Sequence, residues 1–111
     1  MDVLSRLSFL SIERKAYGTV MDQGPTHSDP ALYVFGQTIR LYRKQQGLKQ
    51  KELAALAKLD YTYVSEIERG KRNVTLLSLL RLAVALKVPL SCLLQPLEAH
   101  PELFTKIVSN S

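Results

Sequence analysis

The sequence contains one cysteine, two histidines and no tryptophan. A single cysteine cannot form an intramolecular disulfide or a cysteine metal cluster. His27 and His100 stand apart from other potential ligands and nucleophiles, so we predict neither a metal site nor a cofactor. The chain also lacks a glycine-rich phosphate loop and a nucleophile paired with a base. These absences argue against an enzyme.

Long apolar runs are missing as well. Near the N-terminus, polar residues such as Ser5 and Arg6 interrupt the apolar residues Leu4, Leu7 and Leu10. No stretch is long enough to act as an export signal or to span a membrane, so we expect a cytoplasmic protein with no membrane partner. A chain of 111 residues has room for one compact domain with tails, but not for a second, ligand-sensing domain.

Positive charge is concentrated in the middle of the chain. The formal net charge is +5, and residues 40–72 contain nine basic and four acidic residues, which accounts for the whole excess. A localised positive field is suited to a polyanionic partner such as DNA, because binding releases the counterions condensed on the phosphates. A solvated basic surface is the alternative explanation, and charge alone does not separate the two.

The composition changes along the chain. Turn-forming residues are dense between Gly24 and Pro30, which is typical of a linker, and Met21 just before them is a possible alternative start. We therefore treat residues 1–20 as an optional extension. We divide the chain into an N-terminal extension with linker, a DNA-binding domain and a C-terminal tail, at residues 1–31, 32–95 and 96–111.

From Leu32 onward the apolar residues recur with helical spacing, and no segment alternates convincingly enough to predict a strand. We predict an all-α fold. Gly47 and Gly70 are expected to end the first and third helices, and Pro89 and Pro96 to end the fourth and fifth. The first predicted helix begins at residue 32 and runs to just before Gly47. The other four cover about residues 50–57, 61–69, 76–87 and 90–95.

The second and third predicted helices are separated by only three residues, as in a helix-turn-helix. Asp60 and Thr75 are suited to cap the third and fourth helices. If Val64 and Ile67 face the core, the other side of the third helix can enter the major groove of DNA. The predicted base-reading residues are Tyr61, Thr62, Ser65 and Glu66. On the fourth helix the predicted core-facing residues are Leu76, Leu79, Leu80, Ala83 and Leu86.

Residues 36–94 resemble the phage repressor/Cro family of helix-turn-helix domains, also called the XRE family. The resemblance is carried by Gly36, Ile39, Arg40, Arg43, Gly47, Leu48, Gln50, Leu53, Ala54, residues 63–73, Leu79, Leu82, Ala83, Leu86, Val88 and Pro89. Residues 59–69 are also similar to the recognition helices of restriction-modification controller proteins. Tyr61 departs from the Arg often found at its position, so the operator sequence cannot be transferred. Lys49 stands where Ser or Thr usually caps the second helix, which allows a different position for Gln50.

The resemblance implies a compact five-helix, lambda-repressor-like DNA-binding domain and a role for individual residues. Arg43 is expected to form a structural ion pair with Glu68. The expected phosphate contacts are Gln50, Tyr63, Arg69, Lys71, Arg72 and Arg40. Gln50 would bind at the positive end of a helix dipole, and the basic side chains would set affinity more than base choice.

One short recognition helix reads few base pairs, so we expect a homodimer that regulates transcription from a palindromic or pseudopalindromic operator. Apolar residues in the C-terminal tail are candidates for the dimer interface. They are Leu97, Leu103, Phe104 and Ile107. The alternative is an antitoxin that also binds its own promoter, with the N-terminal extension as the arm that contacts a second protein.

Overall fold

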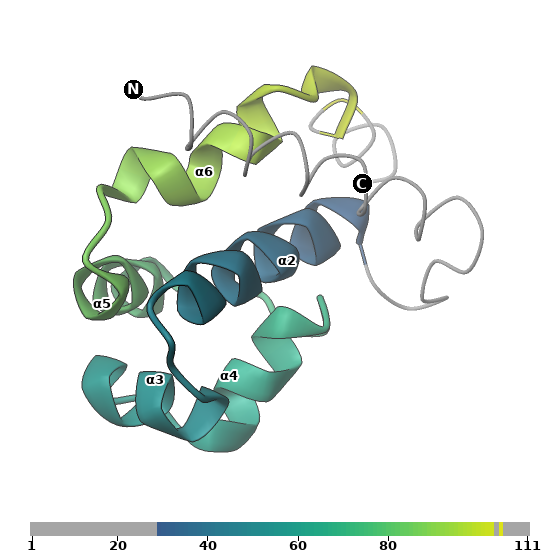
Figure 1. Cartoon of the computed structure of the whole chain (residues 1–111). Coiled ribbons are helices and arrows are strands. Elements are labelled where there is room, and N and C mark those ends of the chain that lie inside the picture. The colour runs from purple at the N-terminus through teal and green to yellow at the C-terminus, as the bar shows by residue number, and fades with distance from the viewer. Residues whose placement is uncertain (1–28, 104, 106–111) are drawn as a thin grey trace.

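The computed structural model describes residues 29–103 and residue 105 (Figure 1). These residues contain helices and no strand, which confirms the all-α prediction. The helices are α2 (Pro30–Gln45), α3 (Gln50–Ala57), α4 (Tyr61–Glu68), α5 (Leu76–Leu86) and α6 (Leu90–Glu98). The predicted extension, most of the linker, Phe104 and Ile107 lie outside the described residues.

The helix ends follow local chemistry. Asp29 caps α2 by accepting a hydrogen bond from the backbone N–H of Ala31 at 2.9 Å. Gly47 follows α2 with φ at +71°, a left-handed conformation that glycine adopts without steric cost. Thr75 accepts from the Ser78 N–H at 3.1 Å, as predicted for the start of α5. Asp60 does precede α4, but its side chain makes no capping bond, so that part of the prediction was wrong.

The central helix is α2. It packs against α4 on one side and α6 on the other, while α5 lies beside α3 (Figure 1). One apolar core joins all five helices, and its fully buried side chains include Ile39, Leu53, Val64, Ile67, Leu82, Leu86 and Leu93. Because each helix contributes to this core, the helix-turn-helix formed by α3 and α4 is fixed to a rigid support.

The predicted end of the last helix was wrong. Pro96 lies inside α6 and is buried, and the helix continues to Glu98. Proline removes one backbone donor and usually breaks a helix. Here the Pro96 ring is buried, and the helical unit runs past the predicted boundary at residue 95.

The core-facing side of α5 was predicted only in part. Leu79, Ala83 and Leu86 do pack into or against the core, and Leu82 joins them. Leu76 and Leu80 are exposed, contrary to the prediction. The segment is apolar on nearly every side, so the sequence offers no polar face to fix which side of the helix turns inward.

The C-terminal residues fold back on α2. Leu103 is 6% exposed and packs with Ala31 and Val34 in a second, smaller apolar cluster. A residue predicted at the dimer interface is thus largely buried within one chain. Leu97 is half-buried and packs against both clusters.

No single described helix is both long enough and apolar enough to cross a membrane. The helices α5 and α6 reach that length and composition only as a pair, and the pair is bent by 114° at the break between them.

Candidate nucleic-acid interface

The turn between α3 and α4 is compact. Lys58 ends α3 in the left-handed region at φ +56°, and the N–H of Leu59 donates to the Ala54 carbonyl at 2.8 Å. Ala54 and Ala57 are buried in the core that α3 and α4 share. Small side chains there allow the two helices to approach closely, which sets their mutual angle.

The inner side of α4 is held tightly. Val64 and Ile67 are fully buried, and the backbone of α4 touches the backbone of α2 at Gly36. A Cβ atom added at Gly36 would lie 2.2 Å from the Ile67 carbonyl oxygen and 2.8 Å from that of Glu68. No side chain larger than hydrogen fits at this position, so Gly36 determines how closely the two helices approach.

The outer side of α4 carries the predicted base-reading residues. Tyr61 and Thr62 are exposed, and Ser65 and Glu66 are partly exposed. The Lys51 ammonium of α3 lies 5.6 Å from the centre of the Tyr61 ring, within the range of a cation–π contact. Sequence reasoning missed Lys51, although its position directly after Gln50 at the start of α3 was a signal for it.

Glu66 and Arg72 form an ion pair at the end of this face. The Arg72 Nε donates to Glu66 Oε1 at 2.8 Å, and the guanidinium lies 5.2 Å from the centre of the Tyr63 ring. The hydrogen bond from Arg72 lowers the pKa of Glu66, and the same bond raises the pKa of Arg72. Tyr63 in turn accepts a hydrogen bond through its hydroxyl from the backbone N–H of Thr75 at 3.4 Å. Arg72 is therefore held in place yet half exposed.

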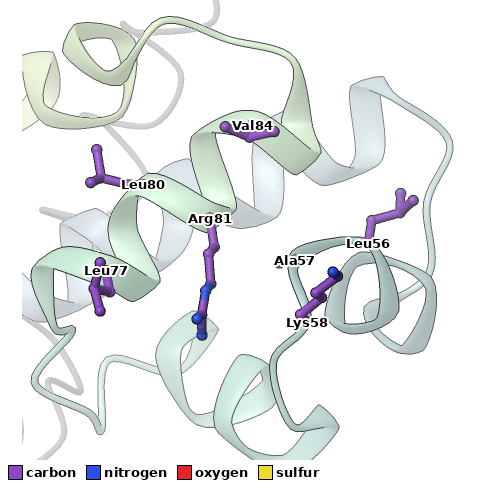
Figure 2. Close-up of a pocket in the computed structure, with 7 residues that line it drawn as sticks. All are labelled: Leu56, Ala57, Lys58, Leu77, Leu80, Arg81 and Val84. Carbon is purple, nitrogen blue, oxygen red and sulfur yellow. The ribbon is translucent and has the colours of Figure 1, made fainter.

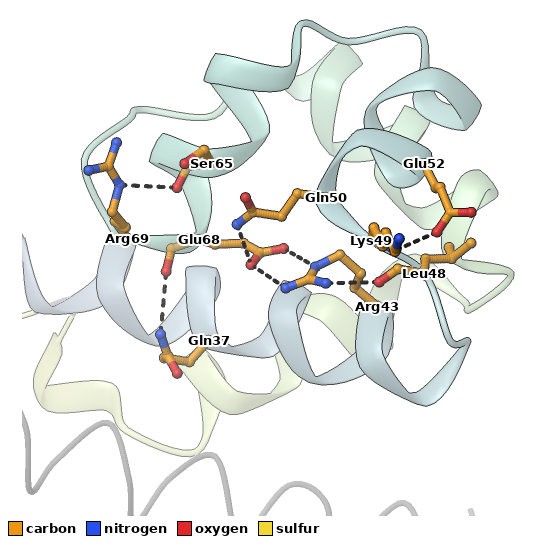
Figure 3. A network of polar contacts seen from close by, with 9 residues as sticks. All are labelled: Gln37, Arg43, Leu48, Lys49, Gln50, Glu52, Ser65, Glu68 and Arg69. Atoms are coloured by element: carbon orange, nitrogen blue, oxygen red, sulfur yellow. Dashed lines mark hydrogen bonds and ion pairs between the residues drawn. The ribbon is translucent and has the colours of Figure 1, made fainter.

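The other predicted phosphate contacts surround α4. Arg69 is exposed, and its Nε donates to the Ser65 carbonyl at 3.4 Å (Figure 3). Lys71 is exposed in the loop after α4, and Arg40 is exposed on α2. The structure thus gathers Arg69, Lys71 and Arg72 at the C-terminal end of α4, while Arg40 lies on a different helix.

Arg43 and Glu68 meet in a buried polar network (Figure 3). The Arg43 Nε donates to Glu68 Oε2 at 2.6 Å, and Nη2 donates to Oε1 at 2.9 Å. The remaining amino group, Nη1, donates to the Leu48 carbonyl at 2.8 Å. The Gln37 side chain donates to the Glu68 carbonyl at 3.3 Å. The network links α2, the α2–α3 connection and the end of α4.

Gln50 belongs to the same network. Its Nε2 donates to Glu68 Oε1 at 3.0 Å, so part of its donor capacity is used inside the protein. At the start of α3 the Glu52 carboxylate accepts from the backbone N–H of Lys49 at 2.7 Å. A shallow hollow of about 430 Å³ opens between the first turns of α3 and α4 and is lined by Arg43, Lys49, Gln50, Lys51 and Tyr61. Lys49, Lys51 and the N-terminus of α3 make it suitable for an anion, whereas the charge of Arg43 is already paired with Glu68.

Comparison with known proteins is consistent with this geometry. The helix-turn-helix family matches residues 39–91, from the middle of α2 to the start of α6. A hypothetical transcription factor of Neisseria meningitidis is 38% identical over 78 residues, which cover 70% of each chain. Control protein C.MunI of a Mycoplasma species is 42% identical over 65 residues, covering 58% of this chain and 88% of that protein. The chain belongs to the XRE-type helix-turn-helix family.

Solved structures place this helix-turn-helix protein among controller proteins. The restriction-modification controller protein C.AhdI from Aeromonas hydrophila superimposes with a TM-score of 0.55 at 47% identity, covering 56% of this chain and 94% of that one. Family membership indicates a DNA-binding regulator rather than an enzyme. The matched residues include α3 and α4, which form the helix-turn-helix.

Proposed function

We propose that this helix-turn-helix protein is a transcriptional regulator of the restriction-modification controller type, which binds a palindromic or pseudopalindromic operator as a homodimer. The observation that carries the proposal is the exposed outer face of α4, with Tyr61 and Thr62 at its start and basic residues at its other end. A helix of this kind fits the major groove, where each base pair presents a distinct pattern of donors and acceptors.

Each group of side chains has a separate task in this proposal. Thr62, Ser65 and Glu66 contact base edges, and Tyr61 lies against a base or a thymine methyl group. The basic side chains and the hollow at the start of α3 bind the phosphates. The proposed phosphate contacts are Gln50, Tyr63, Arg69, Lys71, Arg72 and Arg40, to which the structure adds Lys49 and Lys51.

Gln50 can serve both the fold and the DNA. One of its two amide hydrogens is bound to Glu68, and the second amide hydrogen is free to donate to a phosphate without breaking that bond. The lambda-repressor-like unit that performs this binding extends from residue 30 to residue 98. The residues before this unit would then be an accessory segment, which the predicted division of the chain placed at residues 1–31.

The descriptions of the related proteins favour a regulator over an antitoxin. The related proteins named above are described as a transcription factor and as control or controller proteins. A DNA-binding regulator must reach the DNA. We therefore propose that the protein lies in the cytoplasm, at the nucleoid. A protein partner bound through the N-terminal extension is a separate hypothesis, and co-purification with a second protein would favour it.

Footprinting of the purified protein on DNA from upstream of its own coding sequence tests the proposal. We expect two protected half-sites whose centres are about one helical turn, roughly 34 Å, apart. A scrambled duplex of equal length is the control, and it should be retained only at low salt. Failure to retain any duplex at low salt would overturn the proposal.

A further inference from the structure

The outer side of α4 carries a carboxylate among basic neighbours. Glu66 lies in the last turn of α4, and Arg69, Lys71 and Arg72 follow it. The negative end of the helix dipole lies there, so a carboxylate is unfavourable for the helix. A carboxylate is also repelled by the phosphates of a duplex bound to the same surface. Neither the helix dipole nor phosphate binding therefore explains Glu66.

The other carboxylates of the helix-turn-helix have local roles. Glu52 caps the start of α3, and Asp60 directly precedes α4, so both lie where the helix dipole favours a negative charge. Glu68 is buried and bound to Arg43. Glu66 is thus the carboxylate of this unit that requires another explanation.

The two hollows beside the helix-turn-helix have no carboxylate in their linings. The hollow at the start of α3 is lined by cations, Gln50 and Tyr61. The groove between α5 and the end of α3 is mostly apolar, and Figure 2 shows its two cations, Lys58 and Arg81. Neither hollow therefore offers an acidic acceptor to an amine of the DNA, whereas Glu66 does.

Arg72 compensates the charge of Glu66 and leaves one of its oxygens available. The Arg72 Nε donates to Glu66 Oε1 at 2.8 Å, and no other described residue forms a hydrogen bond or ion pair with the Glu66 side chain. That side chain is 29% exposed, so Oε2 can accept from a ligand on the outer side of α4. Because the Arg72 hydrogen bond lowers the pKa of Glu66, the carboxylate stays ionised at neutral pH and acts only as an acceptor.

Glu66 lies on the same side of α4 as Thr62. The two residues are four positions apart, so they are neighbours on one helix face, while Val64 and Ile67 are buried. Four residues rise about 6 Å along a helix axis, which is close to the height of two stacked base pairs. A base contacted by Glu66 therefore lies within about two base pairs of the base contacted by Thr62.

The major-groove edges of the four bases differ in what they offer an ionised carboxylate. Guanine and thymine present acceptors, which repel it, and only cytosine and adenine present an amine donor. Adenine also places the acceptor N7 beside its amine, and that lone pair opposes a carboxylate. Cytosine presents its N4 amine without a neighbouring acceptor, so it is the base that fits Glu66 best.

We propose that Glu66 reads a cytosine in each half-site of the operator, by accepting a hydrogen bond from the N4 amine through Oε2 while Oε1 stays bound to Arg72. The inference rests on the proposed function and names a base that this site recognises. The Arg72 guanidinium neutralises the carboxylate, so the phosphates on either side of the groove do not expel it. One ion pair thus makes a carboxylate compatible with a DNA-binding surface.

Selection from a duplex library of randomised sequence tests this readout. The wild type, E66Q and E66A are each bound to the library, and the retained duplexes are sequenced. E98Q is the matched control, because it removes the same charge from an exposed position at the end of α6. Circular dichroism checks that each variant keeps the helix content of the wild type, as expected for a substitution outside the core.

We expect the wild type and E98Q to select cytosine at one position of each half-site. A glutamine can bond both N6 and N7 of adenine, so E66Q should select adenine at that position. E66A should accept any base there, because alanine has no acceptor. With isolated duplexes, replacement of the cytosine by thymine should weaken wild-type binding by about 5- to 150-fold and leave E66A nearly unaffected.

A folded E66Q that selects the same bases as the wild type would overturn the inference. It would also fail if the wild type selects another base at the position that E66Q alters, or if that position lies more than about two base pairs from the one altered by Thr62→Ala. If the wild type selects a defined site and E66Q leaves it unchanged, the proposed function stands and the cytosine readout is wrong. If the wild type retains no duplex at low salt, the proposed function is wrong and the readout is wrong with it.

Discussion

The Arg43 guanidinium binds both carboxylate oxygens of Glu68, at 2.6 Å from Nε and 2.9 Å from Nη2. This bidentate pair joins the central helix α2 to the last turn of the recognition helix. Both side chains are almost completely buried, so neither can exchange its partner for water. The orientation of α4 therefore depends on a polar contact as well as on apolar packing.

Removal of one partner of this pair should destabilise the fold strongly. Arg43→Ala leaves the buried Glu68 carboxylate with Gln50 as its remaining side-chain donor, and we expect a loss of about 3–5 kcal/mol in the free energy of unfolding. The double variant R43M/E68L removes both charges and should lose less. Urea unfolding measures both, with the exposed Arg40→Ala on the same helix as a control that changes stability by about 0.5 kcal/mol or less. An equal loss for Arg43→Ala and Arg40→Ala would contradict a structural role.

Phosphate binding and base reading should respond differently to substitution. Arg72→Ala should weaken binding to operator and non-specific DNA alike and reduce the slope of log K against log salt by about 1. Thr62→Ala should cost about 1–3 kcal/mol at the operator and leave non-specific binding nearly unchanged. Fluorescence anisotropy at several salt concentrations measures both, with Lys87→Ala as a control cation outside the proposed site.

Arg72→Ala also leaves the Glu66 carboxylate without its partner beside the DNA. The double variant E66Q/R72A removes that complication, because glutamine carries no charge. If E66Q/R72A binds non-specific DNA as tightly as the wild type, Arg72 does not contact a phosphate and this part of the proposed site is wrong.

The Glu66–Arg72 pair predicts a pH dependence. Because the Arg72 hydrogen bond lowers the folded-state pKa of Glu66, the pair stabilises the fold above the ordinary carboxyl pKa, and that contribution disappears as the pH falls through the lowered pKa. Carbon-13 NMR titration of the Glu66 carboxyl should show the lowered pKa in the wild type. Arg72→Gln should return it toward the ordinary value, whereas Lys44→Gln should not. An unchanged titration in Arg72→Gln would mean that the pair does not form in solution.

Substitution at Gly36 should be more damaging than substitution at Gly47. Gly36→Ala places a methyl group 2.2 Å from the Ile67 carbonyl oxygen, so α2 and α4 must separate, and we expect a loss of about 3 kcal/mol or more. Gly47→Ala meets no atom within 4 Å and suffers only from its φ of +71°, with a cost of about 1–2 kcal/mol. Thermal unfolding ranks the two variants, and a smaller loss for Gly36→Ala would show that the helices are not in backbone contact.

The parts of the fold that were predictable from sequence have unambiguous local signals. The helices α2, α3 and α4 were anticipated closely because Gly47, Gly70 and the helical spacing of apolar residues indicate their limits. The Arg43–Glu68 contact was anticipated only through resemblance to a family, since 25 residues separate the two side chains and no local rule pairs them.

The errors occurred where tertiary packing overrides local pattern. Pro96 was expected to stop α6, but it lies buried inside the helix. On α5, apolar residues on every side left the buried face undetermined, and Leu80 was assigned to the core although it is exposed. The packing of Leu103 on α2 was not predicted either, because a sequence does not reveal that its chain end folds back onto that helix.

The hydrogen bond between the Tyr63 hydroxyl and the Thr75 backbone connects the recognition helix directly to the first residue before α5. One aromatic side chain thus contacts both the cation proposed to bind the DNA backbone and the residue that precedes α5. If operator binding stabilises this contact, then by thermodynamic reciprocity a substitution that stabilises the contact strengthens operator binding by the same factor. The coupling would lie within a segment of thirteen residues, from 63 to 75.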